Sequence, residues 1–200
     1  MNEKSTTRLG IVSGILTTGL LLAAAVLLVR PSPVKAWATP PCDFLTGGGW
    51  IVHNGAKANF GVGGGCKFGS PTWGHLEYID HGIGLNVHWT SITAYMELDT
   101  STGPNGQPTG ARLICGTART NFFGDVDWVV AARDRGEPGR DDEFIIRLRQ
   151  FGVIVYTTEF DSDHTLGGSG PGGGNIQLHK PNPSTTGSFG GSCPALFGGA

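Results

Sequence analysis

A run of charged side chains, flanked by two stretches that alternate like strands, could hold a metal ion. Residues 134–142 read DRGEPGRDD and supply four carboxylates: Asp134, Glu137, Asp141 and Asp142. Calcium takes roughly six to eight oxygen ligands, so carboxylates gathered on a turn suit it. The spacing is not that of an EF-hand loop, and three nearby arginines could neutralise the acids: Arg133, Arg135 and Arg140. Two interpretations stay open, a calcium site and a solvated turn with local ion pairs.

A second group of side chains, around residues 75–88, could hold a transition metal. It contains three histidines and an aspartate: His75, His81, His88 and Asp80. His75 and Asp80 differ by an odd number of positions, so on one strand they point to opposite faces. Structural roles for these side chains are therefore favoured, and a metal-dependent hydrolase built on them is the alternative. The nearby Thr90 and Ser91 have no recognisable nucleophile motif such as G-x-S-x-G.

Tryptophans offer a different kind of site, because an exposed indole ring can stack on a sugar ring. Trp73 follows Gly69-Ser70-Pro71 in an expected loop and is the candidate ligand-binding residue. Trp50, Trp89 and Trp128 lie in alternating stretches and are expected in the core. Residues 168–173 fit G-x-G-x-x-G, but they precede the strand-like NIQLHK and no helix, so a dinucleotide site is not expected.

The four cysteines predict disulfide bonds formed outside the cytoplasm. Cys42, Cys66, Cys115 and Cys193 are even in number, and none forms the close C-x-x-C pair usual in zinc sites. Three pairings are possible. Because Cys42 and Cys193 lie near the two ends of the expected domain, a bridge between them would clamp its termini. That choice leaves Cys66–Cys115 as the second bridge.

The N-terminal 38 residues have the order of a secretory signal peptide. Lys4 and Arg8 precede an apolar stretch, Ile11–Val29, and Ala36-Trp37-Ala38 gives an A-x-A cleavage site before Thr39. An uncleaved membrane anchor is the alternative, since 19 residues nearly span a bilayer at about 1.5 Å each. Without this segment, the chain's 14 basic and 16 acidic groups fall to 10 and 15, a net charge of -5. An acidic domain does not favour a nucleic-acid partner.

The elements that must position these residues are predicted to be short strands. Apolar residues alternate with polar ones between glycine-rich turns, clearest at Leu76/Tyr78, Val126/Trp128/Val130 and Phe144/Ile146/Leu148. The 34 glycines in 200 residues also disfavour long helices. We therefore predict an all-β fold, a two-layer antiparallel β-sandwich of jelly-roll or immunoglobulin-like topology, preceded by an N-terminal hydrophobic signal helix. Its parts would be residues 1–38 (signal peptide), 39–181 (β-sandwich domain) and 182–200 (C-terminal tail).

Several stretches, taken together, resemble a known family. They include CDFLTGGGWI (42–51), WGHLEYIDH (73–81), DRGEPGRDDEFIIRL (134–148) and LGGSGPGGGNIQLHK (166–180). The ordered series resembles the secreted bacterial domain of the post-choice-of-anchor-P type and covers residues 42–181. That family usually has a shorter final glycine block, so Ser169–Gly172 read as an insertion. The resemblance implies an extracellular β-domain but names no activity or substrate.

The sequence as a whole predicts a non-catalytic binding or structural module of the bacterial cell surface or envelope matrix. Its expected partner is a surface protein or glycan, with no nucleic acid, and with the membrane reached only through the N-terminal segment. No cofactor is expected, apart from the possible calcium ion. The expected location is outside the cell or on the outer side of the envelope.

Overall fold

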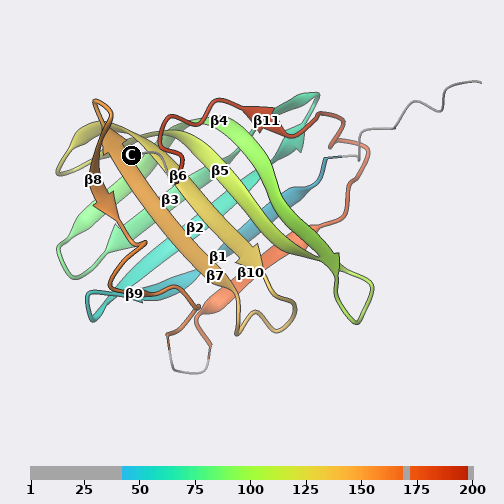
Figure 1. Ribbon diagram of the computed structural model, residues 1–200, viewed down its shortest axis with the longest axis horizontal. Coiled ribbons are helices and arrows are strands. Elements are labelled where there is room, and N and C mark those ends of the chain that lie inside the picture. The colour runs from blue at the N-terminus through green and yellow to red at the C-terminus, as the bar shows by residue number, and fades with distance from the viewer. Residues whose placement is uncertain (1–41, 169–171, 198–200) are drawn as a thin grey trace, which may run out of the picture. The chain divides into compact units, whose positions relative to one another are not determined.

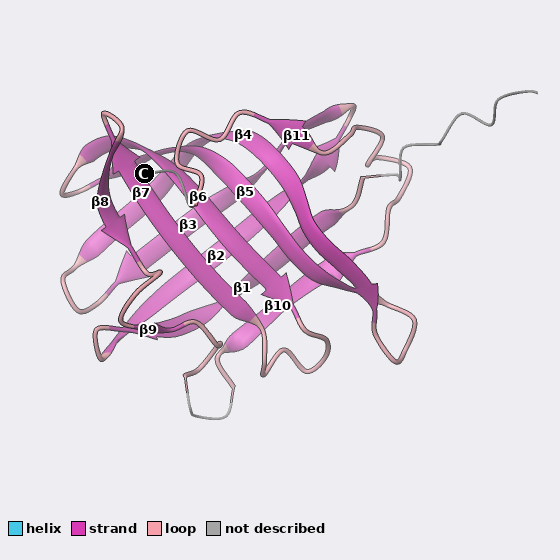
Figure 2. Ribbon diagram, viewed as in Figure 1, coloured by secondary structure: helices cyan, strands magenta, loops and turns pink. Residues whose placement is uncertain are grey.

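Eleven β-strands form the part of the chain that the computed structural model describes, residues 42–168 and 172–197. All of these residues belong to the second of the chain's two units, Thr39–Ala200. The all-β prediction is confirmed (Figure 2). The strands are β1 (Phe44–His53), β2 (Ala56–Lys67), β3 (Ser70–Asp80), β4 (Leu85–Thr102), β5 (Pro108–Thr120), β6 (Gly124–Asp134), β7 (Glu143–Gln150), β8 (Val153–Thr157), β9 (Ser162–Asp163), β10 (Gly174–His179) and β11 (Gly190–Gly191).

The predicted N-terminal signal helix lies outside the described residues. Within them, no helix is long and apolar enough to cross a membrane.

The strands make one antiparallel sheet in the order β10-β1-β2-β3-β4-β5-β6-β7-β8, with β9 beside β1 and β11 beside β4. From β1 to β8 each strand pairs with the next along the chain, so this stretch is a meander. The jelly-roll and immunoglobulin-like topologies would need strands to cross over one another. The predicted sandwich of two separate sheets is therefore not confirmed: the two layers are halves of one curled sheet, with β4–β7 in front of β1–β3 and β10 (Figure 1).

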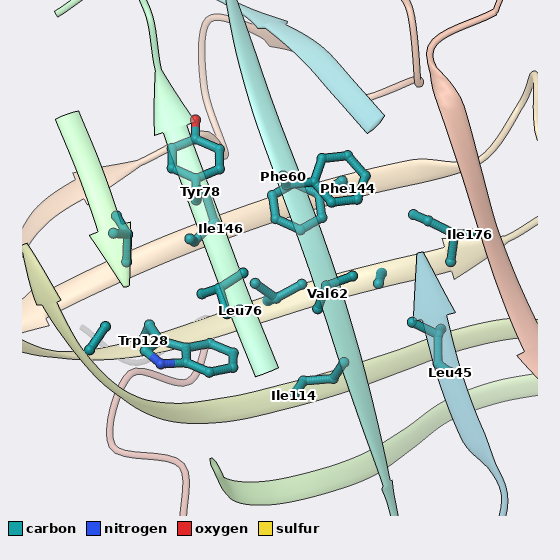
Figure 3. Close-up of a cluster of buried hydrophobic side chains, with 14 of the residues drawn as sticks. Leu45, Phe60, Val62, Leu76, Tyr78, Ile114, Trp128, Phe144, Ile146 and Ile176 are labelled. Carbon is teal, nitrogen blue, oxygen red and sulfur yellow. The ribbon is translucent and has the colours of Figure 1, made fainter. Parts of the chain in front are cut away.

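The core lies between the two halves of the curled sheet. Phe60 from β2 stacks on Phe144 from β7 with ring centroids 3.9 Å apart, and Trp128 from β6 is fully buried (Figure 3). The inward positions of β3, β6 and β7 are those that the alternation predicts: Leu76, Tyr78, Val126, Trp128, Val130, Phe144, Ile146 and Leu148. Alternation determines the face of each residue because successive strand side chains point to opposite sides.

Backbone and side-chain hydrogen bonds join the β10–β1 side of the curled sheet to the β6–β7 loop. The segment 164–167 lies between β1 and β7, where the amide of Gly167 donates to the carbonyl of Trp50 and that of Leu166 to the carbonyl of Asp142, both at 2.9 Å. Two aspartate carboxylates, considered below, join β10 to the β6–β7 loop. The sheet therefore encloses its core without a second sheet.

The predicted disulfide pairs, Cys66–Cys115 and Cys42–Cys193, are wrong. The bonds are Cys42–Cys66 and Cys115–Cys193, with Cα atoms 5.7 and 5.3 Å apart. Because β1 and β2 are antiparallel neighbours, Cys42, two residues before β1, lies beside Cys66 near the end of β2. Cys66 belongs to the main core, whereas Cys115 lies in a smaller buried cluster with Leu113, Val129 and Ala195. The two clusters are on opposite faces of the sheet, which keeps Cys66 and Cys115 apart.

The C-terminal segment, predicted as a tail, is held against the outer face of β4–β6. Its last part covers the smaller cluster of apolar residues, to which Ala195 contributes. The amide of Ser192 donates to the carbonyl of Thr93, and the Arg147 guanidinium donates to the carbonyl of Leu196 at 2.7 Å. The segment therefore buries apolar side chains of β4–β6 that a bare sheet face would expose to water.

Candidate functional site

An aromatic group lies on the outer face of β1–β3, at the predicted ligand-binding residue. Cross-strand pairing places Phe44, Gly65 and Trp73 side by side in one row across the three strands. The Phe44 ring meets Trp73 edge-on at 6.2 Å between centroids and stacks on His179 of β10 at 4.3 Å. Trp73 therefore lies within β3, half-buried in a set of packed rings, and not in the expected loop.

A small open pocket of about 190 Å³ lies beside these rings. It is lined by Phe44, Lys67, Trp73, Asn182, Ser184 and Thr185. The ammonium group of Lys67 lies 5.1 Å from the centre of the Trp73 ring. The chain from 182 to 185 is fixed by a local turn, in which the amide and hydroxyl of Ser184 both donate to the Asn182 side-chain oxygen. The pocket lining thus combines two aromatic rings with amide, hydroxyl and ammonium groups.

Glycines on the outer face of β2 let these rings lie flat against the backbone. A Cβ atom on Gly65 would come within 2.6 Å of the Phe44 Cβ atom, and one on Gly63 within 3.0 Å of the His75 ring. Farther along β2, nothing lies within 4 Å of the corresponding position on Gly61. The outer face is therefore filled at Gly65 and Gly63, beside Trp73 and His75, and open at Gly61, beside Glu77.

Trp50 lies on this same outer face, so its predicted place in the core is wrong. Its neighbour Ile51 is fully buried on the inward face, and alternation turns Trp50 outward, where it is half-buried. The Lys57 ammonium lies 4.9 Å from the centre of the Trp50 ring. Trp128 is in the core as predicted, and Trp89 packs against its margin.

Two ammonium groups lie beside these rings, that of Lys57 at Trp50 and that of Lys67 at Trp73. Burial lowers the pKa of His179 below its usual value of 6.5, which keeps its imidazole neutral at neutral pH. Glu77 and His88 form an exposed contact at 2.5 Å. Neutral aromatic rings can stack on the apolar face of a ligand ring, while neighbouring hydroxyl and amide groups bond to the hydroxyls of that ligand.

The four carboxylates of the predicted calcium loop lie in different surroundings. Asp134 and Asp142 are buried, and each accepts two backbone hydrogen bonds. The Asp134 oxygens accept from the amides of Gly136 and Leu178, at 2.7 and 2.8 Å. Those of Asp142 accept from Arg135 and Ile176, also at 2.8 and 2.7 Å. Both side chains thus hold β10 against the β6–β7 loop.

The other two acids of that loop are exposed. Glu137 accepts a hydrogen bond from the Asn175 amide at 3.2 Å, and Asp141 lies at the surface. Arg135 pairs with Glu143 at 2.6 Å. Over residues 42–168 and 172–197, no group of three or more histidine, cysteine, aspartate or glutamate side chains is arranged to hold a metal ion. Calcium binding by these four residues stays a prediction, which the backbone bonds of Asp134 and Asp142 do not favour.

Burial raises the pKa of Asp142 to about 6. The two backbone amides oppose this rise because they stabilise the carboxylate, whereas the charges of Asp134 and Glu137 add to it. A group that titrates near neutrality therefore lies where β10 meets the rest of the sheet.

The predicted histidine group is not assembled. His75 points outward from β3 and Asp80 inward, as their odd spacing predicts. His81 bonds to the Asn59 side chain at 2.9 Å, while Asp80 accepts hydrogen bonds from the Tyr156 hydroxyl and the Gly82 amide, each at 2.8 Å. His81 and Asp80 thus have separate structural partners.

A buried polar network near β9 was missed by sequence reasoning. The Nδ1 atom of His53 lies 2.6 Å from the Ser162 hydroxyl, a pair that resembles a base and a nucleophile. The Asn54 amide nitrogen, however, is 3.1 Å from the other ring nitrogen, Nε2. Since that amide donates, Nε2 must accept, so the proton of the neutral ring is on Nδ1. His53 then donates to Ser162 and does not act as a base toward it.

A buried ion pair was also missed. Arg112 is 1 % exposed and donates to the Asp43 carboxylate at 2.5 Å, and the Tyr95 hydroxyl donates to the same carboxylate at 2.7 Å. The partners are 69 and 52 residues apart. Only the order of strands brings them together, so the local sequence carries no signal for either network.

No family model, curated protein or solved structure matches the chain. The resemblance to the post-choice-of-anchor-P type of domain therefore stays a prediction.

Proposed function

We propose that this protein is a non-catalytic binding module of the bacterial cell surface or envelope, and that it binds a glycan. The binding surface is the outer face of β1–β3 around Trp73. The observation that carries the proposal is the pocket that the rings of Phe44 and Trp73 line together with the polar side chains of Asn182 and Ser184. Rings of this kind stack on the apolar face of a sugar, and the polar groups bind its hydroxyls.

The disulfides support the place of action. Cys42–Cys66 and Cys115–Cys193 are bonds of an oxidising compartment, which the cytoplasm is not. Together with the export signal predicted in residues 1–38, they favour a protein that works outside the membrane. A glycan-rich cell wall or envelope matrix is the environment in which such a module would find its ligand.

The test is binding of the exported protein to cell-wall polysaccharides and a panel of glycans. We expect Trp73→Ala to weaken binding about tenfold or more, because a central aromatic side chain carries a large share of a binding free energy. Phe68→Ala is the matched control: it removes an exposed ring from the adjoining β2–β3 turn that does not line the pocket. Absence of glycan binding, or equal losses in both variants, would contradict the proposal.

A further inference from the structure

Three neighbouring turns carry exposed apolar side chains at one end of the sheet. They are the β3–β4, β5–β6 and β7–β8 turns, at the left in Figure 1. We call their four most exposed apolar residues the apolar tips: Ile83 (53 % exposed), Phe122 (54 %), Phe151 (95 %) and Val153 (64 %). Exposed apolar groups clustered in this way mark surfaces that leave water when they bind.

Phe151 occupies a backbone conformation that does not suit its type. It has φ 50° and precedes Gly152 at φ 80°, the geometry of a tight hairpin turn. The β1–β2 turn has the same geometry but uses Asn54 and Gly55, at φ 49° and 75°. Asparagine tolerates this region, whereas a bulky residue is strained there. Since the Phe151 ring is almost wholly exposed, packing within the domain does not explain its presence.

His81 is the one titratable side chain of the three turns. The sequences HGIGLNV (81–87), TNFFG (120–124) and QFGVIV (150–155) contain no aspartate, glutamate, lysine or arginine. Behind the β5–β6 turn, the first charges form a pair, Arg119 with Asp125. Ionised groups are costly to bring into an apolar medium, so their absence from the tips suits transfer out of water.

Polar backbone groups of the turns are bonded to one another through side chains. Asn121 accepts from the amide of Asn86 and donates to the carbonyl of Gly84, each at 2.8 Å, which joins the β5–β6 turn to the β3–β4 turn. The Gln150 amide donates to the carbonyl of Phe123, which joins the β5–β6 turn to the end of β7. These bonds would persist in a medium of low polarity, where an unbonded group is costly.

We infer that the apolar tips insert into the interfacial region of a lipid bilayer. The tips are uncharged, which suits the boundary between the headgroups and the acyl chains of a bilayer. They also offer no pattern of charges that a protein partner could complement. They also lie on separate projecting turns. A protein partner would need a fitted hollow for each of them, whereas a fluid bilayer adapts to separate projections.

The test is cosedimentation of the exported protein with phosphatidylcholine vesicles, with the same N-terminus in every variant. Phe151→Asn is the decisive change, because asparagine suits the turn conformation and so the domain stays folded. We expect it to lower the partition coefficient about tenfold, as loss of one large apolar contact does. Phe68→Asn is the matched control: Phe68 is 81 % exposed, has φ 53° and precedes Gly69 at the other end of the sheet.

We expect Phe68→Asn to bind like the unchanged protein, and binding to persist in high salt and to need no anionic lipid. Four results would overturn the inference. The first is that the unchanged protein binds vesicles no better than Phe151→Asn, and the second is that both variants lose binding equally. The third is binding that requires phosphatidylglycerol and disappears in high salt. The fourth is that the unchanged protein forms a dimer which Phe151→Asn abolishes. None of them bears on glycan binding, which the Trp73 variant tests separately.

Discussion

Phe151 and Asn54 occupy the same place in two hairpin turns, and the comparison gives a stability prediction at the residue scale. We expect Phe151→Asn to stabilise the fold by about 1 kcal/mol, because it removes a bulky residue from a left-handed conformation and loses no buried contact. Urea unfolding measures the change. The reverse substitution, Asn54→Phe, should destabilise by more than this, because it also removes the hydrogen bond from the Asn54 amide to His53. A loss of stability in Phe151→Asn would show that the ring packs within the domain.

Single residues were predictable from the sequence where one face of a strand is clearly apolar. Leu76 and Tyr78 alternate with His75 and Glu77, and the inward face was assigned correctly. The prediction for Trp50 was wrong because its strand carries apolar residues on both faces, and the inward one is Ile51. Leu113 and Cys115 alternate in the same way, yet they face away from the main core and are buried by the C-terminal segment. Alternation shows that two residues share a face, but it does not show which face is covered.

At the scale of elements, Asp142 makes the attachment of β10 depend on pH. Its folded-state pKa of about 6 lies above the usual 3.8, so the folded state binds a proton more tightly than the unfolded state. The stability that this group contributes is therefore fully present below pH 3.8 and is lost as the pH rises through 6. Between pH 7 and pH 5 we expect it to add about 1 kcal/mol to the free energy of unfolding.

The measurement is urea unfolding of the unchanged protein and Asp142→Asn at both pH values. Burial lowers the pKa of His53 and His179, so their contribution to stability falls as the pH drops. For this reason the difference between the two proteins, and not either profile alone, isolates Asp142. Asp141→Asn is the matched control, and it should keep the pH dependence of the unchanged protein. The same profile in Asp142→Asn would assign the proton to another group.

The positions of the strands in the sequence were easier to predict than their order in the sheet. The alternation located β3, β6 and β7, but it contains no information on which strand lies beside which. That order decides whether the sheet curls or splits in two, and it also decides the disulfides. Cys42 and Cys66 meet because β1 and β2 are paired. The predicted pairing of Cys42 with Cys193 rested only on their positions near the two ends of the domain.

At the scale of the whole molecule, the N-terminal segment predicts export. We expect the released protein to begin at Thr39, because Ala36-Trp37-Ala38 has the small residues at the positions that signal peptidase requires. N-terminal sequencing of material secreted by expressing cells checks this. Recovery of the protein only in membranes, with Met1 retained, would instead establish an anchored form.

With the export that the N-terminal segment predicts, the Cys115–Cys193 bond would impose an order of events on folding. Strands β1–β8 pair with their sequence neighbours, so each can join the sheet as soon as it leaves the translocation channel. Cys193 follows all of these strands in the chain, and until it reaches the sheet Leu113 and Val129 would stay uncovered on the outer face. A copy exported in this way would therefore pass through an intermediate with an exposed apolar patch. The lifetime of that intermediate would depend on how quickly Cys115 and Cys193 are oxidised.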